Sequence, residues 1–159
     1  MAMELFRTMA GITLTHVAFK GSAASVIAVI GGEIPLLTAG LGQAMPHAES
    51  GRLRILAVTS EKRSAFAPNI PSVSESPGLA GYEAVAWQGL LGLAHLPAPV
   101  VWLLNGTIDR MLRQPSVIDQ LAARAWIPAS RTPAAFSALI ASDVLKWAHV
   151  MRTASVGTE

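Results

Sequence analysis

Residues His16 to Gly32 read "HVAFKGSAASVIAVIGG" and indicate the class of fold. Its start completes the alternating, β-branched segment "ITLTHVAF" at 12–19, a pattern typical of a strand. A Lys-Gly-Ser corner follows at 20–22. The small and apolar residues after it predict a helix that stops at the Gly31-Gly32 pair. A strand, a turn and a helix in this order form the building unit of an α/β fold.

Further segments of the same kind lie on both sides of this stretch. An amphipathic segment over 3–11 predicts a short helix that ends on a glycine. "EIPLLT" at 33–38 and "RLRILAVTS" at 52–60 predict two more strands, with a short helix between them across 42–51. Because strands and helices alternate with short connections, we expect an α/β fold with a parallel-rich sheet flanked by helices and right-handed crossovers.

A long connection separates this part from the rest of the chain. Residues 61–81 are rich in proline, serine and glycine and lack periodicity, which indicates a surface connection. "YEAVAWQGLLGLA" at 82–94 predicts a long strand, or two strands joined by a bend at Gly89. The remainder is predicted to be helical, with helices that begin near Pro99, at Pro115 and at Pro133, the last capped by Thr132.

The composition excludes several classes of function. The chain is 52% hydrophobic and 14% charged, and the basic residues behind its net charge of +2 are scattered, so nucleic-acid binding is not expected. It has no cysteine and its four histidines lie far apart, so no metal site and no cofactor is expected. The uncharged stretch between Glu83 and Asp109 is interrupted by glycines, prolines and polar residues and predicts no membrane span.

Sequence motifs of catalysis are missing. There is no Gly-x-Ser-x-Gly elbow, the Gly-x-Gly at 40–42 lacks the rest of a dinucleotide fingerprint, and the Lys-Gly-Ser at 20–22 has the wrong order for a P-loop. Three aspartates, Asp109, Asp119 and Asp143, fall on predicted helices, where we expect them on solvated faces. These features favour a binding protein over an enzyme.

The Lys20-Gly21-Ser22 corner has the chemistry of an anion receptor. At a helix N-terminus the first backbone N–H groups lack intrahelical acceptors and lie at the positive end of the helix dipole. Gly21 lets the backbone approach a ligand closely and Ser22 adds a hydroxyl, so a carboxylate or a phosphate would fit. A capping serine after a tight turn would look the same, and the residues alone leave both interpretations open.

Several linked motifs resemble one family. "HVAFKGSAAS" at 16–25, "IGGEIPLLTAGLGQAMPHAESGRLRILAVTSEKRS" at 30–64 and "PNIPSVSESPGLAGYEAVAWQGLL" at 68–91 stand in the order found in the substrate-binding proteins of tripartite tricarboxylate transporters, the Bug or TctC family. The family's counterparts include a His-Val-Pro-Tyr-Lys-Gly-Ser stretch, a Leu-Ala-Val-Thr-Ser strand and a Tyr-Glu-x-x-x-Trp-x-Gly-Leu strand. The resemblance runs from about Glu4 to Val156.

The resemblance implies a two-lobed extracytoplasmic binding protein, of the periplasmic-binding-protein type II kind. Such a protein closes on a small organic acid, for example a di- or tricarboxylic acid, without catalysis, and works with membrane transporter subunits. The resemblance assigns residues 1–81 to the second lobe, and 82–159 to the crossover strand and the C-terminal helical portion of the first lobe. The ligand-binding residues that it implies are Lys20, Gly21, Ser22, Ala23, Ala24, Ala39, Gly40 and Trp87.

The family resemblance and the start of the chain predict different cellular locations. The resemblance implies a periplasmic protein. "MAMELFRTMAG" at 1–11, however, shows neither the apolar region nor the cleavage site of a signal peptide, which predicts a cytoplasmic location if Met1 is the true start.

Two departures from the family pattern bear on function. The chain begins where family members are already about midway, so the strands that open the first lobe are expected to be missing. Ala39 and Gly40 stand where an Asp-Asn pair is common beside the ligand. The alternative function is therefore a truncated domain without ligand that acts only as a structural or oligomerising module. The apolar excess predicts a homodimer, and exchange of the 83–159 segment between two chains is one way to form it.

Overall fold

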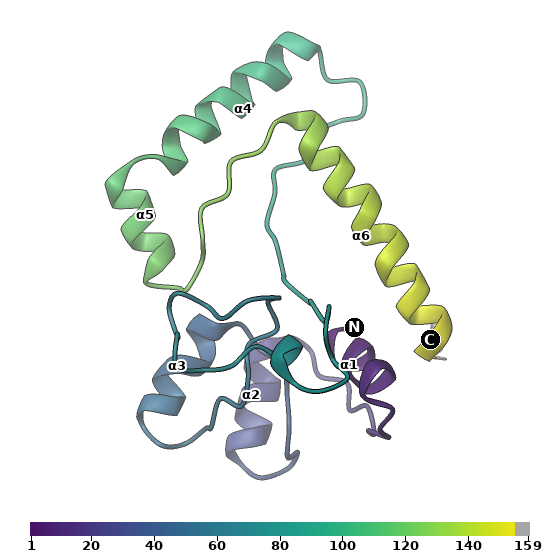
Figure 1. The fold of residues 1–159 in the computed structure, drawn as a ribbon. Coiled ribbons are helices and arrows are strands. Elements are labelled where there is room, and N and C mark those ends of the chain that lie inside the picture. Colours follow the sequence, from purple (N-terminus) through teal and green to yellow (C-terminus); the bar gives the residue numbers. More distant parts are fainter. Residues whose placement is uncertain (155–159) are drawn as a thin grey trace. The chain divides into compact units, whose positions relative to one another are not determined.

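The computed structural model describes residues 1–154 of the 159-residue chain. These residues divide into two compact units (Figure 1). Unit 1 comprises Met1–Val85 together with the end of the chain from Val150, and unit 2 comprises Ala86–His149. In the described part of the chain, no helix is long and apolar enough to cross a membrane.

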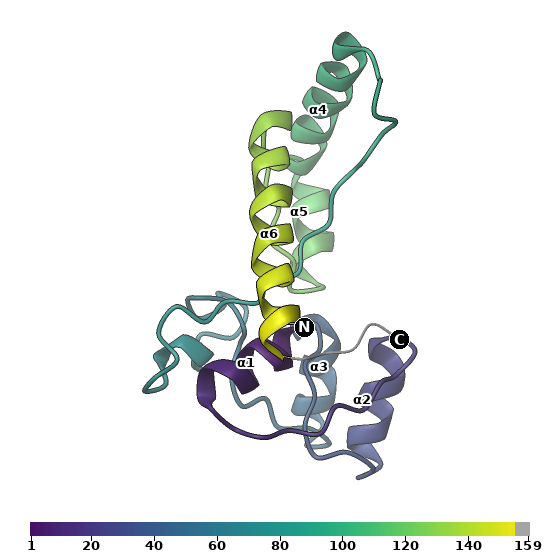
Figure 2. The ribbon, with the colours of Figure 1, turned by 90° about the vertical axis from the view of Figure 1, so that its right-hand side faces the viewer.

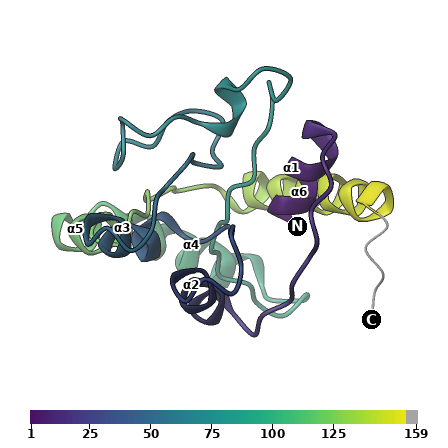
Figure 3. The same cartoon turned by 90° about the horizontal axis from the view of Figure 1, so that it is seen from below.

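Unit 1 contains three α-helices, and all three agree with the sequence. They are α1 (Ala2–Ala10), α2 (Ser22–Ile30) and α3 (Leu41–Glu49), and Figure 3 shows them from below. Helix α1 ends because Gly11 adopts the left-handed conformation, with φ 63°, and its N–H bonds back to the Arg7 carbonyl. This is the helix-ending role that the glycine predicted.

The core of unit 1 gathers around Tyr82. Its side chain is 1% exposed, its hydroxyl donates to the Ala2 carbonyl at 3.1 Å, and Phe6 meets its ring edge-on at 6.2 Å. Burial raises the pKa of the Tyr82 phenol. The other buried apolar residues of this unit are small or β-branched, apart from one leucine: Val26, Ala28, Val58, Leu79, Ala84 and Val150.

The predicted sheet is where the structure differs from the sequence analysis. The described residues contain no β-strand: 12–19 and 53–57 lack regular secondary structure, and the only pairing is a parallel bridge between Val58 and Ser72. One further backbone bond runs from the Ala84 N–H to the Thr59 carbonyl at 2.8 Å. A ladder needs several consecutive pairs. The parallel-rich sheet is therefore not confirmed.

The connection over 61–81 is better organised than its composition suggested. It contains a short 3-10 helix, η1 (Val73–Glu75), with a capping box: the Ser72 hydroxyl accepts from the Ser74 N–H, and the Glu75 carboxylate accepts from the Ser72 N–H. Arg63 donates to both Glu75 oxygens, at 2.8 and 2.6 Å. Ser72 is 1% exposed and its hydroxyl donates to the Ser60 carbonyl. The Ser-x-x-Glu motif at 72–75, which the sequence analysis missed, is the signal that could have predicted this turn.

Unit 2 contains helices α4 (Ala98–Leu112) and α5 (Pro115–Ala122) and most of α6 (Pro133–Ala154) (Figure 2). Pro115 and Pro133 begin α5 and α6 as predicted, and Pro99 is the second residue of α4. The Thr132 hydroxyl accepts from the Ala135 N–H at 3.2 Å, the expected cap. Within this unit α4 packs on α5. No residue between Ala86 and His149 is buried.

We expect Glu75 to make the stability of unit 1 depend on pH in acid. Hydrogen bonds from Arg63 and from the Ser72 N–H lower the pKa of Glu75 from 4.5 to about 2. Because the folded-state pKa is the lower one, this stabilisation is complete above pH 4.5 and is lost as the pH falls toward about 2. Urea unfolding of the wild type and Glu75→Gln should differ at neutral pH and converge over this range.

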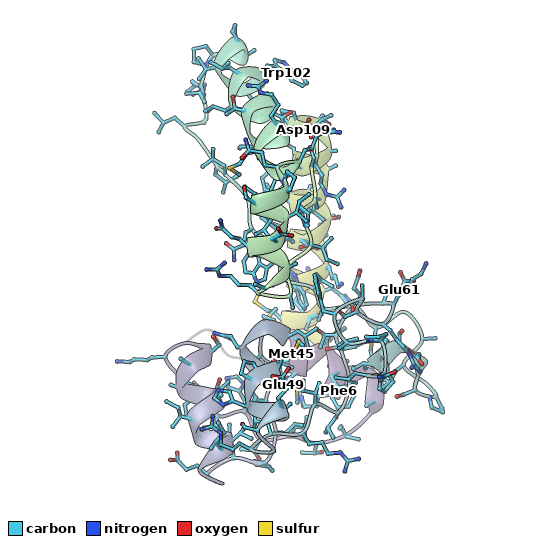
Figure 4. The ribbon with its side chains drawn as sticks, turned by 90° about the vertical axis from the view of Figure 1, so that its left-hand side faces the viewer. Phe6, Met45, Glu49, Glu61, Trp102 and Asp109 are labelled. Carbon is cyan, nitrogen blue, oxygen red and sulfur yellow. The ribbon has the colours of Figure 1, made fainter. Side chains whose placement is uncertain are left out.

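The exposed Glu49 on α3, labelled in Figure 4, supplies the control for the loss of one negative charge. Glu49→Gln should leave the acid dependence of the wild type in place. A stability difference between the wild type and Glu75→Gln that stays constant with pH would contradict the assignment.

Candidate anion-binding site

The Lys20–Ala24 corner is built by one glycine. Gly21 has φ 91° and ψ 162°, and it directly precedes the first residue of α2, Ser22. Its N–H donates a hydrogen bond to the Phe19 carbonyl at 2.9 Å. Residues with a side chain rarely adopt this backbone conformation, so the corner depends on glycine at this position.

The donors of the corner are backbone groups. The first N–H groups of α2, on Ser22, Ala23 and Ala24, have no acceptor within a helix, and no side chain caps this end. Lys20 to Ala23 are exposed and Ala24 is half-buried. An exposed helix start next to a lysine attracts negative charge, and three adjacent N–H groups match the oxygens of a carboxylate.

Within the chain itself, Gly21 is required by its backbone conformation. A Cβ placed on Gly21 would meet no heavy atom within 4 Å. The constraint on this residue inside the chain is therefore its positive φ and not a lack of space. A side chain here would change the backbone of the corner rather than collide with a neighbour.

The second predicted element, Ala39-Gly40, precedes another helix. Gly40 is the N-cap of α3, in extended conformation with φ −62° and ψ 136°, and its carbonyl accepts from the N–H groups of Gln43 and Ala44 at 2.9 and 3.1 Å. Neither Ala39 nor Gly40 has a polar side chain. This loop can offer a ligand backbone groups and little else.

Trp87, the last predicted site residue, lies in unit 2 and makes contacts there. Its indole N–H donates to Asp143 Oδ2 at 2.6 Å, and its ring meets Phe136 edge-on with 5.2 Å between centroids. The bond is an exposed one, so Asp143 lies at the surface as expected and also contacts Trp87. This contact was not predicted, although Phe136 and Asp143 are seven residues, or about two turns, apart on α6.

Gly89 completes this cluster of Trp87, Phe136 and Asp143. A Cβ on Gly89 would lie 2.2 Å from Phe136 Cζ, and two further ring atoms would lie within 3.0 Å. The ring of Phe136 therefore occupies the space that a side chain at position 89 would need. Glycine here allows α6 to approach the extended segment that carries Trp87.

Comparison with known proteins identifies the class. The chain is similar to the R. palustris protein Rpa4515, solved with adipate, with 29% identity, a TM-score of 0.86, and coverage of 97% of this chain and 51% of that one. It is also similar to the periplasmic binding protein BugD, with 22% identity, a TM-score of 0.76, and coverage of 98% and 52%. The fold is thus that of the periplasmic binding proteins.

The sequence comparisons then give the family. The family described as "Tripartite tricarboxylate transporter family receptor", TctC, matches residues 1–156. A UPF0065 protein of Bordetella bronchiseptica is 32% identical over 154 residues, 96% of this chain and 45% of that protein. The protein BugT of Bordetella pertussis is 29% identical over 149 residues, 94% of this chain and 45% of that protein. The chain belongs to the TctC family, and it spans about half the length of these two curated relatives.

These findings confirm the family resemblance on which the sequence analysis relied. The family is one of receptors, which agrees with the predicted preference for a binding protein over an enzyme. The individual ligand-binding residues and the division into lobes at residue 81 stay predictions.

We expect Gly89→Ala to destabilise unit 2. The new methyl group would overlap the Phe136 ring, which must move and lose its contact with Trp87. Aromatic pairs of this geometry contribute about 0.5–1.5 kcal/mol, so we expect a loss of about 1 kcal/mol in the free energy of unfolding, measured by urea unfolding with tryptophan fluorescence.

Gly106→Ala, within α4, is the matched control for this change. There the nearest atom to the new Cβ is Arg110 Nη1 at 3.7 Å, and the higher helix propensity of alanine predicts a gain of about 1 kcal/mol. Unchanged stability of Gly89→Ala would show that the ring contact contributes nothing.

Proposed function

We propose that the chain is the ligand-binding part of an extracytoplasmic solute-binding protein, and that it binds a small di- or tricarboxylic acid. The observation that carries this proposal is the Lys20–Ala24 corner, where Gly21 holds a positive φ and exposes the N–H groups that begin α2. The adipate in the Rpa4515 structure supports a dicarboxylate as the class of ligand.

Each predicted site residue has a specific part in this proposal. Gly21, Ser22, Ala23 and Ala24 supply the corner and its N–H donors, and Lys20 adds a positive charge. Ala39 and Gly40 contribute backbone from the start of α3. Trp87 lies in unit 2 and its N–H is already bonded to Asp143, so it would offer a ligand the face of its ring.

The lobes, the cellular location and the partners in this proposal are inferred from the family. In this proposal residues 1–81 form the second lobe of a two-lobed receptor, and 82–159 form the crossover segment and the C-terminal helical portion of the first lobe. Periplasmic location and delivery of the acid to membrane transporter subunits belong to the same proposal, which the TctC match supports.

Affinity for a carboxylate is expected to be low. Binding sites that hold small molecules tightly bury most of the ligand surface, whereas the corner is exposed and presents mainly backbone donors. We therefore expect dissociation constants of about 1 mM, equivalent to about −4 kcal/mol.

The test is titration of the full chain with adipate, malate and citrate, followed by NMR or calorimetry. Gly21→Val should abolish binding, because valine does not tolerate φ 91° and the N–H groups would turn away. Gly51→Val is the matched control: Gly51 also has a positive φ, 71°, with no atom near its Cβ, but it follows the end of α3. It should lose similar stability and still bind.

Two results would count against the proposed site. Binding that survives Gly21→Val would place the ligand elsewhere, and equal loss in Gly51→Val would point to general destabilisation. A folded wild type that binds none of the three acids would favour the alternative of a structural or oligomerising module without ligand. The exposed apolar residues of unit 2 are the observation in favour of that alternative.

A further inference from the structure

Helix α6 holds one tryptophan by two contacts of different kinds. The Trp87 indole N–H donates a hydrogen bond to Asp143 Oδ2 at 2.6 Å. The Trp87 ring also meets the ring of Phe136 edge-on, with 5.2 Å between the centroids and 87° between the planes. Both partners come from α6, whereas Trp87 lies on the segment before α4, which has no regular secondary structure. One helix thus holds the side chain of an irregular segment.

Together the two contacts determine how the indole ring is oriented. The hydrogen bond fixes the direction of the N–H, because such bonds weaken steeply when they are bent. The acceptor is a carboxylate, which makes the bond stronger than one to a neutral oxygen. The edge-on contact with Phe136 then fixes the plane of the ring about that direction, since this is a favoured geometry of aromatic pairs. The ring is therefore held in one orientation before any ligand arrives.

Gly89 keeps Phe136 in place in turn. The point where a Cβ on Gly89 would stand is 2.2, 2.8 and 3.0 Å from three atoms of the Phe136 ring. The ring therefore lies against the backbone of the segment that carries Trp87, two residues further along the chain. The contacts run in both directions, because the segment gives a tryptophan to α6 and α6 gives a phenylalanine to the segment.

These contacts occupy the hydrogen-bond donor of Trp87 and leave part of its ring exposed. An indole has a single N–H, and Asp143 already accepts from it. A carboxylate that approached this N–H would have to displace Asp143 and would meet a second negative charge there. The residue is 39% exposed, so ring surface is still accessible. Trp87 can therefore offer a ligand apolar contact but no hydrogen bond.

We propose that Asp143 is a positioning residue for Trp87, and that Trp87 recognises an apolar part of a ligand and is not a donor to its carboxylate. Asp143 acts through the indole and does not itself contact the ligand. A side chain that is already ordered loses less freedom on binding, so the held ring raises affinity. The orientation of the ring is a property of unit 2, and only its contact with an acid rests on the proposed function.

The first test needs no ligand. The full chain contains four tryptophans, and a two-dimensional nitrogen–proton NMR spectrum shows one indole N–H signal for each. Trp87→Phe identifies the Trp87 signal by removing it. We expect Asp143→Leu to move this signal to lower proton frequency, because the N–H loses its acceptor. Asp143→Asn keeps an acceptor oxygen and should restore most of the shift.

Asp119→Leu is the matched control for the loss of a carboxylate in unit 2. Asp119 lies on α5 and is exposed, so its replacement should leave the Trp87 signal where it is in the wild type. Urea unfolding of each variant verifies that the compared proteins are folded.

The second test measures adipate binding in a double-mutant cycle. Asp143→Leu should weaken binding about two- to tenfold, the cost of ordering one side chain on binding. In the Trp87→Phe background there is no indole N–H to hold, so the same change should have no further effect. Asp143→Asn removes the charge but keeps the acceptor and should bind nearly as well as the wild type, which separates orientation from charge.

The failure of this proposal and that of the proposed function are distinguishable. If the wild type binds no adipate, the proposed function fails, and the Trp87 signal still decides whether Asp143 positions the ring. An unchanged signal in Asp143→Leu, or an equal change in Asp119→Leu, overturns the positioning role. A loss of affinity of the same size in the Trp87→Phe background shows that Asp143 acts independently of Trp87 and overturns it as well.

Discussion

Unit 1 depends on the burial of one tyrosine. Tyr82 follows a long connection, yet its hydroxyl bonds to the carbonyl of Ala2, and its ring packs on Phe6, so it joins the two ends of an 80-residue stretch. At roughly 25 cal/mol per Å², a buried ring of about 200 Å² contributes about 5 kcal/mol, a large share of the stability of a small domain. The ordered 61–81 connection ends at this residue. The capping box at 72–75 and the Arg63–Glu75 pair therefore act on a segment whose far end is already fixed.

What the sequence predicted well was encoded locally. Each helix begins or ends at a residue whose own chemistry requires it: Gly11 by its left-handed backbone, Thr132 by its cap, Pro115 by its fixed φ. The predicted sheet is different, because a ladder depends on partners far away in the chain, and alternation along one segment does not say which partner is present. The bond between Trp87 and Asp143 is non-local in the same way. The turn at 72–75 was not predicted, although its Ser-x-x-Glu motif is local, because the proline-rich composition around it indicated an irregular connection.

The predicted site depends mainly on backbone N–H groups and only in part on side chains. The N–H groups that begin α2 are the same whether the residues are serine or alanine, so substitutions at 23 and 24 leave the donors in place. Gly21 is different, because its φ of 91° sets the direction in which those donors point. A site of this kind tolerates drift in its side chains and depends on one backbone angle. It follows that sequence similarity to a family motif can decline around the corner while the N–H groups that begin α2 keep their direction.

The two units are stabilised in different ways, and this difference bears on whether unit 2 can stay folded by itself. Unit 1 has buried residues and a closed connection. Unit 2 has helix caps, the packing of α4 on α5, and the cluster of Trp87, Phe136 and Asp143. It also has hydrogen bonds between segments, such as the one that the Asn105 side chain donates to the Arg131 carbonyl at 2.8 Å. A hydrogen bond with Ser130 and a further one from Arg113 lower the pKa of Asp109, yet these groups lie at the surface, where ion pairs contribute little. Helices of this length are marginal in water without a packed face. The order of unit 2 therefore requires cover for its apolar surface from outside its own contacts.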